Sequence, residues 1–136
     1  GGWTADVVWD SSRSLRTKFS SAVLHDGYAF GLSDGILECV NLETGEREWK
    51  KGRYHQGQVL LVSDLLLVTS EAGEVALVSA SPEGYQELAK QDFIGDVTWN
   101  NAALSGDRLL IRNSDEAACI LLPILPPVDS EEFQDR

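Results

Sequence analysis

The chain has 136 residues, 43% of them hydrophobic, and its 22 acidic against 11 basic residues give a formal net charge of −11. This acidic balance argues against nucleic acid as a partner, because phosphate binding requires a positively charged surface. No stretch approaches the roughly 18 consecutive apolar residues of a membrane-spanning helix, and no signal peptide is recognisable, so no membrane span is expected in this segment.

Three stretches of the chain follow one template: residues 22–40, 60–78 and 102–120. They align without a gap, and the second and third copies begin 38 and 80 residues after the first. Each copy holds three short apolar runs separated by two polar turns, as at Asp34-Gly35 in the first copy. This pattern predicts a meander of β-strands repeated about every forty residues, a spacing typical of a propeller blade or a solenoid unit.

The template places the expected strands along the chain. An outer strand is expected at 6–9, since Trp9 lies forty residues before Trp49. The first unit is expected to hold strands at 20–24, 28–32, 36–40 and 46–50, the second at 58–62, 65–70, 74–78 and 85–89, and the third at 100–104, 108–112 and 117–122. The third unit therefore lacks a fourth strand.

Residues 39–49 read CVNLETGEREW. They resemble the tryptophan-docking motif of quinoprotein-type propellers: a small residue, any residue, Asp, two variable residues, Thr-Gly, three variable residues and Trp. Cys39 and Asn41 depart from the pattern but keep a small residue and a short polar side chain that can brace a turn. With the residues before it, this segment makes about thirty residues similar to a PQQ-like β-propeller repeat.

The resemblance implies an all-β fold, a β-propeller of four-stranded antiparallel blades. The chain would supply about three blades plus an orphan outer strand, the C-terminal part of a larger protein. In this interpretation the blade-docking residues are Trp9, Thr44, Gly45 and Trp49. The predicted organisation is a partial propeller over 1–122, with the outer strand at 6–9 and blades at 19–50, 57–89 and 98–122, followed by an acidic, proline-containing tail over 123–136.

The resemblance also implies a function. It predicts a non-catalytic scaffold or protein-binding module of the bacterial cell envelope, periplasmic or envelope-associated, similar to the propeller lipoprotein of the outer-membrane β-barrel assembly machinery. A protein partner is expected, and the incomplete blades allow self-association. The alternative is a terminal segment of a PQQ-dependent quinoprotein dehydrogenase whose catalytic residues lie outside this chain.

Catalytic and metal-binding motifs are absent from the sequence. It has no glycine-rich phosphate loop, no GxSxG, no HExxH, no calcium loop and no CxxC. No catalytic, cofactor-binding or metal-binding residue is therefore assigned, and this chain is not expected to be an enzyme; for a longer parent protein the question stays open. Cys39 and Cys119 occupy the same template position in units two apart, which predicts two buried thiols too distant for a disulfide.

One face of the expected fold gathers polar side chains. Strand direction alternates in a meander, so the connectors between units and the turns between second and third strands emerge on the same side. We expect a binding site there, at the mouth of the central channel. The alternatives are that the polar residues only satisfy loop amides, and that Trp99 packs instead of lining the channel. The candidate residues are His55, Gln56, Trp99, Asn100, Arg112 and Asn113.

Overall fold

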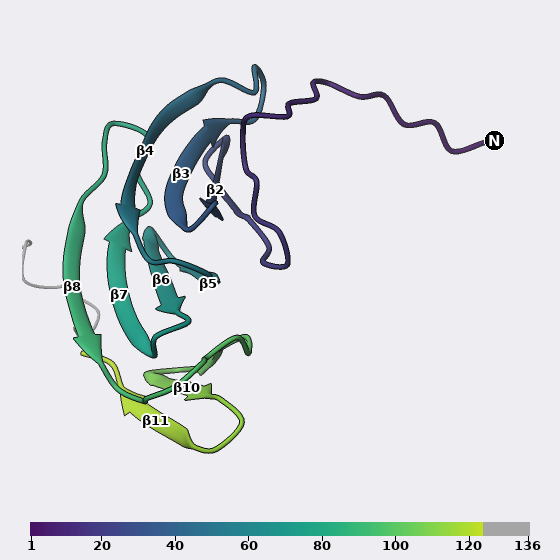
Figure 1. Cartoon of the computed structure of the whole chain (residues 1–136). Coiled ribbons are helices and arrows are strands. Elements are labelled where there is room, and N and C mark those ends of the chain that lie inside the picture. The colour runs from purple at the N-terminus through teal and green to yellow at the C-terminus, as the bar shows by residue number, and fades with distance from the viewer. Residues whose placement is uncertain (124–136) are drawn as a thin grey trace, which may run out of the picture.

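The computed structural model describes residues 1–123, which form eleven β-strands in three antiparallel sheets and, within that range, no helix. Each sheet is a meander of consecutive strands, and the sheets follow one another along an arc with β4 and β8 on its convex side (Figure 1). The first sheet contains β1 (Val23–His25), β2 (Tyr28–Ser33), β3 (Ile36–Asn41) and β4 (Arg47–Arg53); the second β5 (Gly57–Val62), β6 (Leu65–Ser70), β7 (Glu74–Ser79) and β8 (Glu87–Asp92); the third β9 (Ala103–Ser105), β10 (Arg108–Arg112) and β11 (Ala117–Leu121).

Tight turns fix the register of the first sheet. The turns Asp26-Gly27 and Asp34-Gly35 have positive φ at both residues, 46° and 84° in the first and 50° and 80° in the second. Two such residues are what a two-residue type I′ hairpin requires, and Asp-Gly is a preferred sequence for it. The turns accordingly pair His25 with Tyr28 and Ser33 with Ile36.

The expected all-β architecture is confirmed, and most strand bounds differ from the prediction by a few residues. β6 and β10 coincide with their predicted ranges, whereas β1 and β9 begin three residues later than expected and contain three residues each. β8 begins at Glu87 instead of residue 85. The reason is that Tyr85 lies in the preceding turn, with its ring packed against Gly52.

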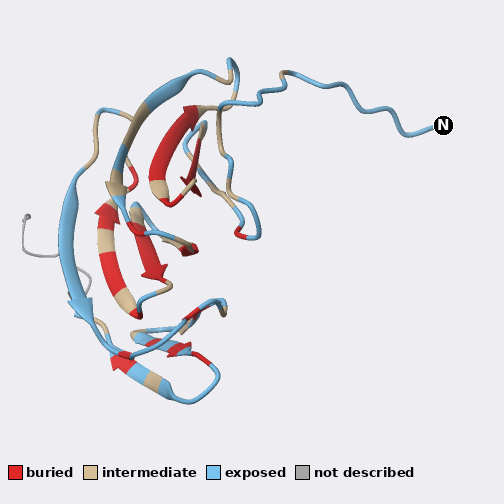
Figure 2. Ribbon diagram, viewed as in Figure 1, coloured by how far each residue is buried: buried red, intermediate tan, exposed pale blue. Residues whose placement is uncertain are grey.

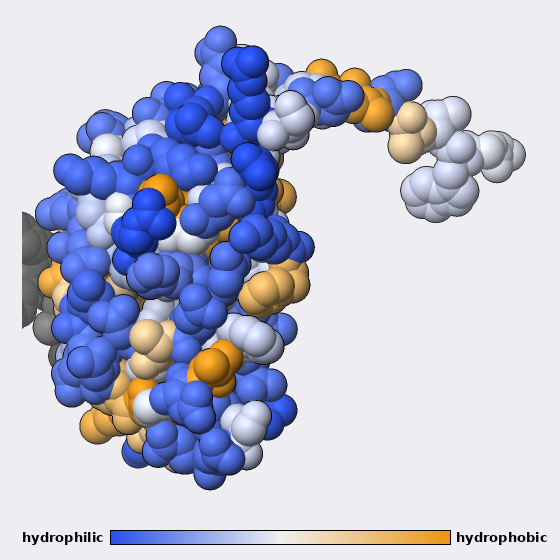
Figure 3. Space-filling view, viewed as in Figure 1, coloured by the Kyte–Doolittle hydropathy of each residue, from blue (hydrophilic) through white to orange (hydrophobic). Residues whose placement is uncertain are grey.

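Residues 6–9 were expected to form an outer strand, and the structure assigns none there. An outer strand needs a neighbouring strand to bond to, and no strand within residues 1–123 pairs with this segment. The segment instead projects from a mainly hydrophilic face with apolar side chains along it (Figure 3). Trp3, Val7 and Val8 are fully exposed or nearly so.

The core consists of two apolar clusters, one on each side of the second sheet. Phe30 of the first sheet packs with Leu66 and Val68 of β6 in one cluster, and Leu67 of β6 packs with Leu109 in the other. Successive side chains of a strand point to opposite faces. The continuous apolar sequence of β6 therefore reflects a sheet buried on both faces, while β8 is exposed along its whole length (Figure 2).

The two cysteines are free, but only one is buried. Burial, together with the charges of Glu48 and Glu38, raises the pKa of the Cys39 thiol to about 12, so this thiol stays protonated and unreactive. Cys119 was also expected to be buried and is exposed. Cys39 is covered because β4 places Trp49 beside it, whereas no fourth strand pairs with β11 within residues 1–123.

The acidic tail predicted for residues 123–136 lies outside the described residues, apart from Pro123. Between residues 1 and 123, no helix has the length and apolar character needed to cross a membrane.

Candidate functional site

The indole of Trp9 is anchored on the turn that follows β3. Its Nε1 donates a hydrogen bond of 2.7 Å to the carbonyl of Leu42. The ring lies against Gly45, where an added Cβ would approach within 2.7 Å of it. Asn41 braces this turn, because its Oδ1 accepts hydrogen bonds from the amides of Glu43 and Thr44. The glycine and the short polar side chain of the motif therefore both have a structural role.

Trp49 makes the corresponding contact with the second sheet. Its Nε1 donates to the carbonyl of Ser81 over 2.8 Å, and its ring lies 6.0 Å from Phe30 and 5.8 Å from Tyr85 between ring centroids. The accepting turns are equivalent in the two sheets. The amide of Leu42 bonds to the carbonyl of Gly27 in one, as Ala80 bonds to Asp64 and Leu122 to Asp107 in the others.

A buried hydroxyl network lies next to Trp49. The Tyr54 and Tyr85 hydroxyls lie 2.7 Å apart, and each is within hydrogen-bonding distance of Oε2 of Glu87. The two hydroxyl hydrogens serve two of these three contacts at a time. Burial, and the hydrogen bond to Glu87, raise the pKa of Tyr54. Burial alone would raise the pKa of Glu87, but the two hydroxyl donors and Lys90 bring it below its ordinary value. The protonated Tyr54 and the ionised Glu87 therefore join the connector between the first two sheets to the start of β8.

A buried carboxylate, that of Glu38, holds the N-terminal connector in place. Glu38 is fully buried, accepts a 2.9 Å hydrogen bond from the amide of Leu15 and forms an ion pair with Arg47. Arg47 also donates through Nη2 to the carbonyl of Arg13. A buried charge is tolerated only when it is paired and hydrogen-bonded. The paired Glu38 therefore has a structural role, and its carboxylate is not accessible to a ligand.

The predicted binding residues lie on a surface that we call the turn face. It is formed by the turns at 34–35, 71–73 and 114–116 with the connectors at 13–20, 54–56 and 93–100. These segments are tied together by backbone bonds, including the Asp34 amide to the Arg16 carbonyl and the Tyr54 amide to the Gly35 carbonyl. The turns at 34–35 and 71–73 therefore have their backbone fixed by connectors from outside their own hairpins, whereas the turn at 114–116 is joined to the connector at 93–100 through the side chains of Asn113 and Glu116.

Glu71 brings two of the predicted site residues together. Its Oε1 accepts a hydrogen bond from the amide of Gln56 over 3.3 Å, and its Oε2 accepts one from Nε1 of Trp99 over 3.1 Å. The Trp99 ring is 56% exposed and lies 6.0 Å from that of Phe19, which is 57% exposed. Trp99 therefore presents a fixed, half-exposed aromatic surface. The sequence analysis did not select Glu71 or Phe19.

The other predicted residues are not part of this cluster. Asn113 is buried and joins its own loop to the connector at 93–100, accepting from the amides of Asp115 and Glu116 and donating to the carbonyl of Gly95. His55 and Arg112 are exposed and Asn100 is half-buried; none of the three has a side-chain hydrogen bond to another residue in the described part of the chain.

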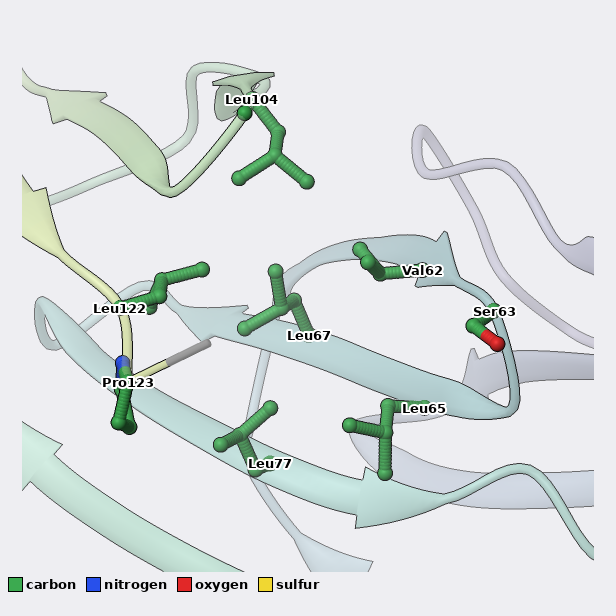
Figure 4. Close-up of a pocket in the computed structure, with 9 residues that line it drawn as sticks. Val62, Ser63, Leu65, Leu67, Leu77, Leu104, Leu122 and Pro123 are labelled. Carbon is green, nitrogen blue, oxygen red and sulfur yellow. The ribbon is translucent and has the colours of Figure 1, made fainter. Parts of the chain in front are cut away.

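Two apolar hollows lie between the second sheet and the third; the second of them reaches the turn face at Phe93. The first, the Leu104 hollow, has a volume of about 320 Å³, and its leucines point into the space between the two sheets (Figure 4). It is lined by Val62, Ser63, Leu65, Leu67, Leu77, Leu104, Gly106, Leu122 and Pro123. The second, the Ala89 hollow, has about 290 Å³ and is lined by Leu67, Val75, Leu77, Ala89, Lys90, Gln91, Phe93, Ile120, Leu121, Leu122 and Pro123. Neither hollow was expected from the sequence.

Metal-binding chemistry has no candidate among residues 1–123, where no three His, Cys, Asp or Glu side chains come close enough to hold an ion. Glu71 and Asn113 of the turn face are held by hydrogen bonds to the chain itself. The surface available to a partner there includes the half-exposed pair Phe19 and Trp99 and the exposed side chains of His55 and Arg112.

No protein-family model and no curated protein matches this chain. Among solved structures it is similar to a computationally designed protein, Ika8, with a TM-score of 0.54 and 11% sequence identity. The similarity covers 66% of this chain and 28% of Ika8, so the chain spans under a third of that protein's length. At this identity the likeness bears on the fold alone.

Proposed function

We propose that the three sheets are successive blades of a β-propeller of the PQQ-like type. The hydrogen bonds of Trp9 to the Leu42 carbonyl and of Trp49 to the Ser81 carbonyl support this assignment, since both acceptors lie in the turn after a third strand, one residue apart in register. In each case an indole forty residues from the other bonds to the turn after a third strand. The motif around Thr44 and Gly45 and the repeated four-stranded meander agree with it.

For the function, we propose a non-catalytic protein-binding module of the bacterial cell envelope that uses the turn face as its interface. The observation that supports this most directly is the exposed pair of Phe19 and Trp99, with Trp99 held by Glu71. Aromatic side chains with little conformational freedom are enriched among the residues that dominate binding energy in protein interfaces. Adjoining exposed apolar side chains, such as these two rings, are typical of interaction sites.

Site-specific photocrosslinking in cells that produce the protein tests this function. A benzophenone amino acid at Arg112, on the turn face, is expected to give adducts of discrete mass, which the Trp99→Ala variant loses. The matched control places the same group at Asp64, in the exposed turn between β5 and β6. Equal adducts at both positions, or none at either, would contradict a partner on the turn face.

A cofactor titration separates this function from the alternative of a PQQ-dependent dehydrogenase segment. Since the described residues contain no metal-binding cluster, we expect no thermal shift when PQQ and calcium are added to the purified chain. A saturable shift at micromolar PQQ would favour the dehydrogenase.

A further inference from the structure

The indole series of the chain is interrupted at its third position. Trp9 and Trp49 are forty residues apart, and the next step of forty reaches Ala89. Strand register gives the same equivalence, because Trp49 of β4 pairs with Cys39 and Ala89 of β8 pairs with Leu77, the matching residue of β7. Trp49 thus fills the contact between the first and second sheets with an indole. The equivalent residue between the second and third sheets, Ala89, has only a methyl group.

The residue facing this position also changes. Phe30 pairs with Cys39 in the first sheet, and Leu67 pairs with Leu77 in the second, so Leu67 stands where Phe30 packs against Trp49. Two aromatic rings in one interface are replaced by a leucine and an alanine in the next. Large-to-small replacement in a packed interior leaves a cavity wherever the surroundings do not collapse.

The Ala89 hollow lies at this position. Ala89 and Leu67 are both in its wall, and its volume of about 290 Å³ adjoins the Leu104 hollow through the shared residues Leu67, Leu77, Leu122 and Pro123. An apolar cavity of roughly 150 Å³ is already large enough to stay dry and to bind benzene. The Ala89 hollow exceeds this volume and is lined mainly by apolar side chains, but it opens to solvent along β8, where Ala89, Lys90 and Gln91 are exposed, so it would cover a larger ring on one side only.

We propose that the Ala89 hollow is a binding site for a small planar aromatic molecule of the size of indole. Such a ring would occupy the place that Trp49 takes in the preceding interface. In the interface between the first two sheets, the indole of Trp49 donates to the carbonyl of Ser81. Ala80 and Leu122 are equivalent, since the amide of each bonds to the residue just before the second strand of its sheet. The residue after Ala80 is Ser81 and the residue after Leu122 is Pro123, so Pro123 is the equivalent of Ser81. Pro123 lines the hollow, which makes indole, with its single N–H donor, the appropriate probe. This site does not depend on the function proposed for the turn face.

Calorimetric titration of the full chain with indole tests the proposal. We expect saturable binding at one site with a dissociation constant on the order of 1 mM or tighter, the range for a ligand of so few atoms. Ala89→Trp places an indole in the hollow and is expected to weaken binding at least tenfold. Leu88→Trp is the matched control: Leu88 neighbours Ala89 on β8, is 50% exposed and lines neither hollow. Its affinity is expected to stay within about twofold of the parent chain.

Other outcomes would overturn the proposal. They are the absence of saturable binding to the full chain, and an unchanged affinity in Ala89→Trp. If Ala89→Trp converts a dimer to a monomer in sedimentation while indole does not bind, the occupant is a second copy of the chain and the proposal fails. Circular dichroism checks the folding of each variant, and Ala89→Leu, a smaller filling side chain, replaces Ala89→Trp if the latter does not fold; its affinity must then fall.

Discussion

Replacing Trp49 with alanine tests the assignment of the indole contacts most directly. The substitution removes a half-buried indole together with its hydrogen bond to Ser81 and its two aromatic neighbours, Phe30 and Tyr85. Large-to-small substitution of a packed tryptophan costs about 3 to 5 kcal/mol. Within that range, each aromatic pair accounts for roughly 0.5 to 1.5 kcal/mol and the hydrogen bond for about 1 kcal/mol. We expect Trp49→Ala to lower the free energy of unfolding by this amount.

Trp99→Ala is the matched control for that measurement. Trp99 is more than half exposed and has one aromatic neighbour and one indole hydrogen bond, to Glu71. We therefore expect a loss of roughly 1 to 2 kcal/mol. Urea denaturation followed by circular dichroism gives both values in a single experimental series. Equal losses, or a larger loss for Trp99→Ala, would refute the placement of Trp49 between the sheets.

Three further predictions follow from the buried polar groups and the exposed N-terminal segment. Arg47→Met leaves the buried Glu38 carboxylate without its cation and is expected to cost about 3 to 5 kcal/mol in urea denaturation; a change below about 1 kcal/mol would contradict the structural role of the pair. The pKa of Glu87 is lower in the folded protein than in the unfolded chain, so its stabilising contribution is present above the unfolded pKa and is lost as pH falls through the folded pKa. Tyr54→Phe, which removes one donor to that carboxylate, should flatten the fall in stability below the ordinary pKa of glutamate; an identical pH profile would show that the hydrogen bond does not set the shift. The isolated chain is expected to self-associate at low micromolar concentration, because the apolar segment around Trp3 is exposed, and light scattering showing a compact monomer would count against this.

The strands that sequence predicted best are those whose apolar pattern is strongest. β6 and β10 were placed to the residue, since short apolar runs between polar turns left little choice of boundary. β8 was placed two residues early, because its side chains are all exposed and its sequence has no apolar alternation to fix the ends. The apolar pattern of the sequence therefore predicted the bounds of β6 and β10 but not those of the exposed outer strand β8.

Site residues could be selected from the sequence only where they recur at the same position of the repeated unit. The forty-residue spacing selected Trp9 and Trp49, whose indoles each donate to a turn carbonyl, although Trp9 does not lie in the strand expected for it. The same spacing extended by one step reaches Ala89. Glu71 was missed because its role arises from three separate segments that the fold brings together. Asn113 was selected as a binding residue, yet its side chain is hydrogen-bonded to its own loop and to Gly95 of the connector between β8 and β9, which a sequence pattern does not reveal.

The burial of the second sheet on both faces has a consequence for cooperativity. Each sheet is formed by consecutive strands, so the contacts within a sheet are local in sequence, and the two apolar clusters each join only neighbouring sheets. Stability in such an array approximates a one-dimensional sum of unit and nearest-neighbour terms. The second sheet is the unit that takes part in both interfaces. Loosening it would uncouple the first sheet from the third, whereas loosening the third would leave the interface between the first two intact.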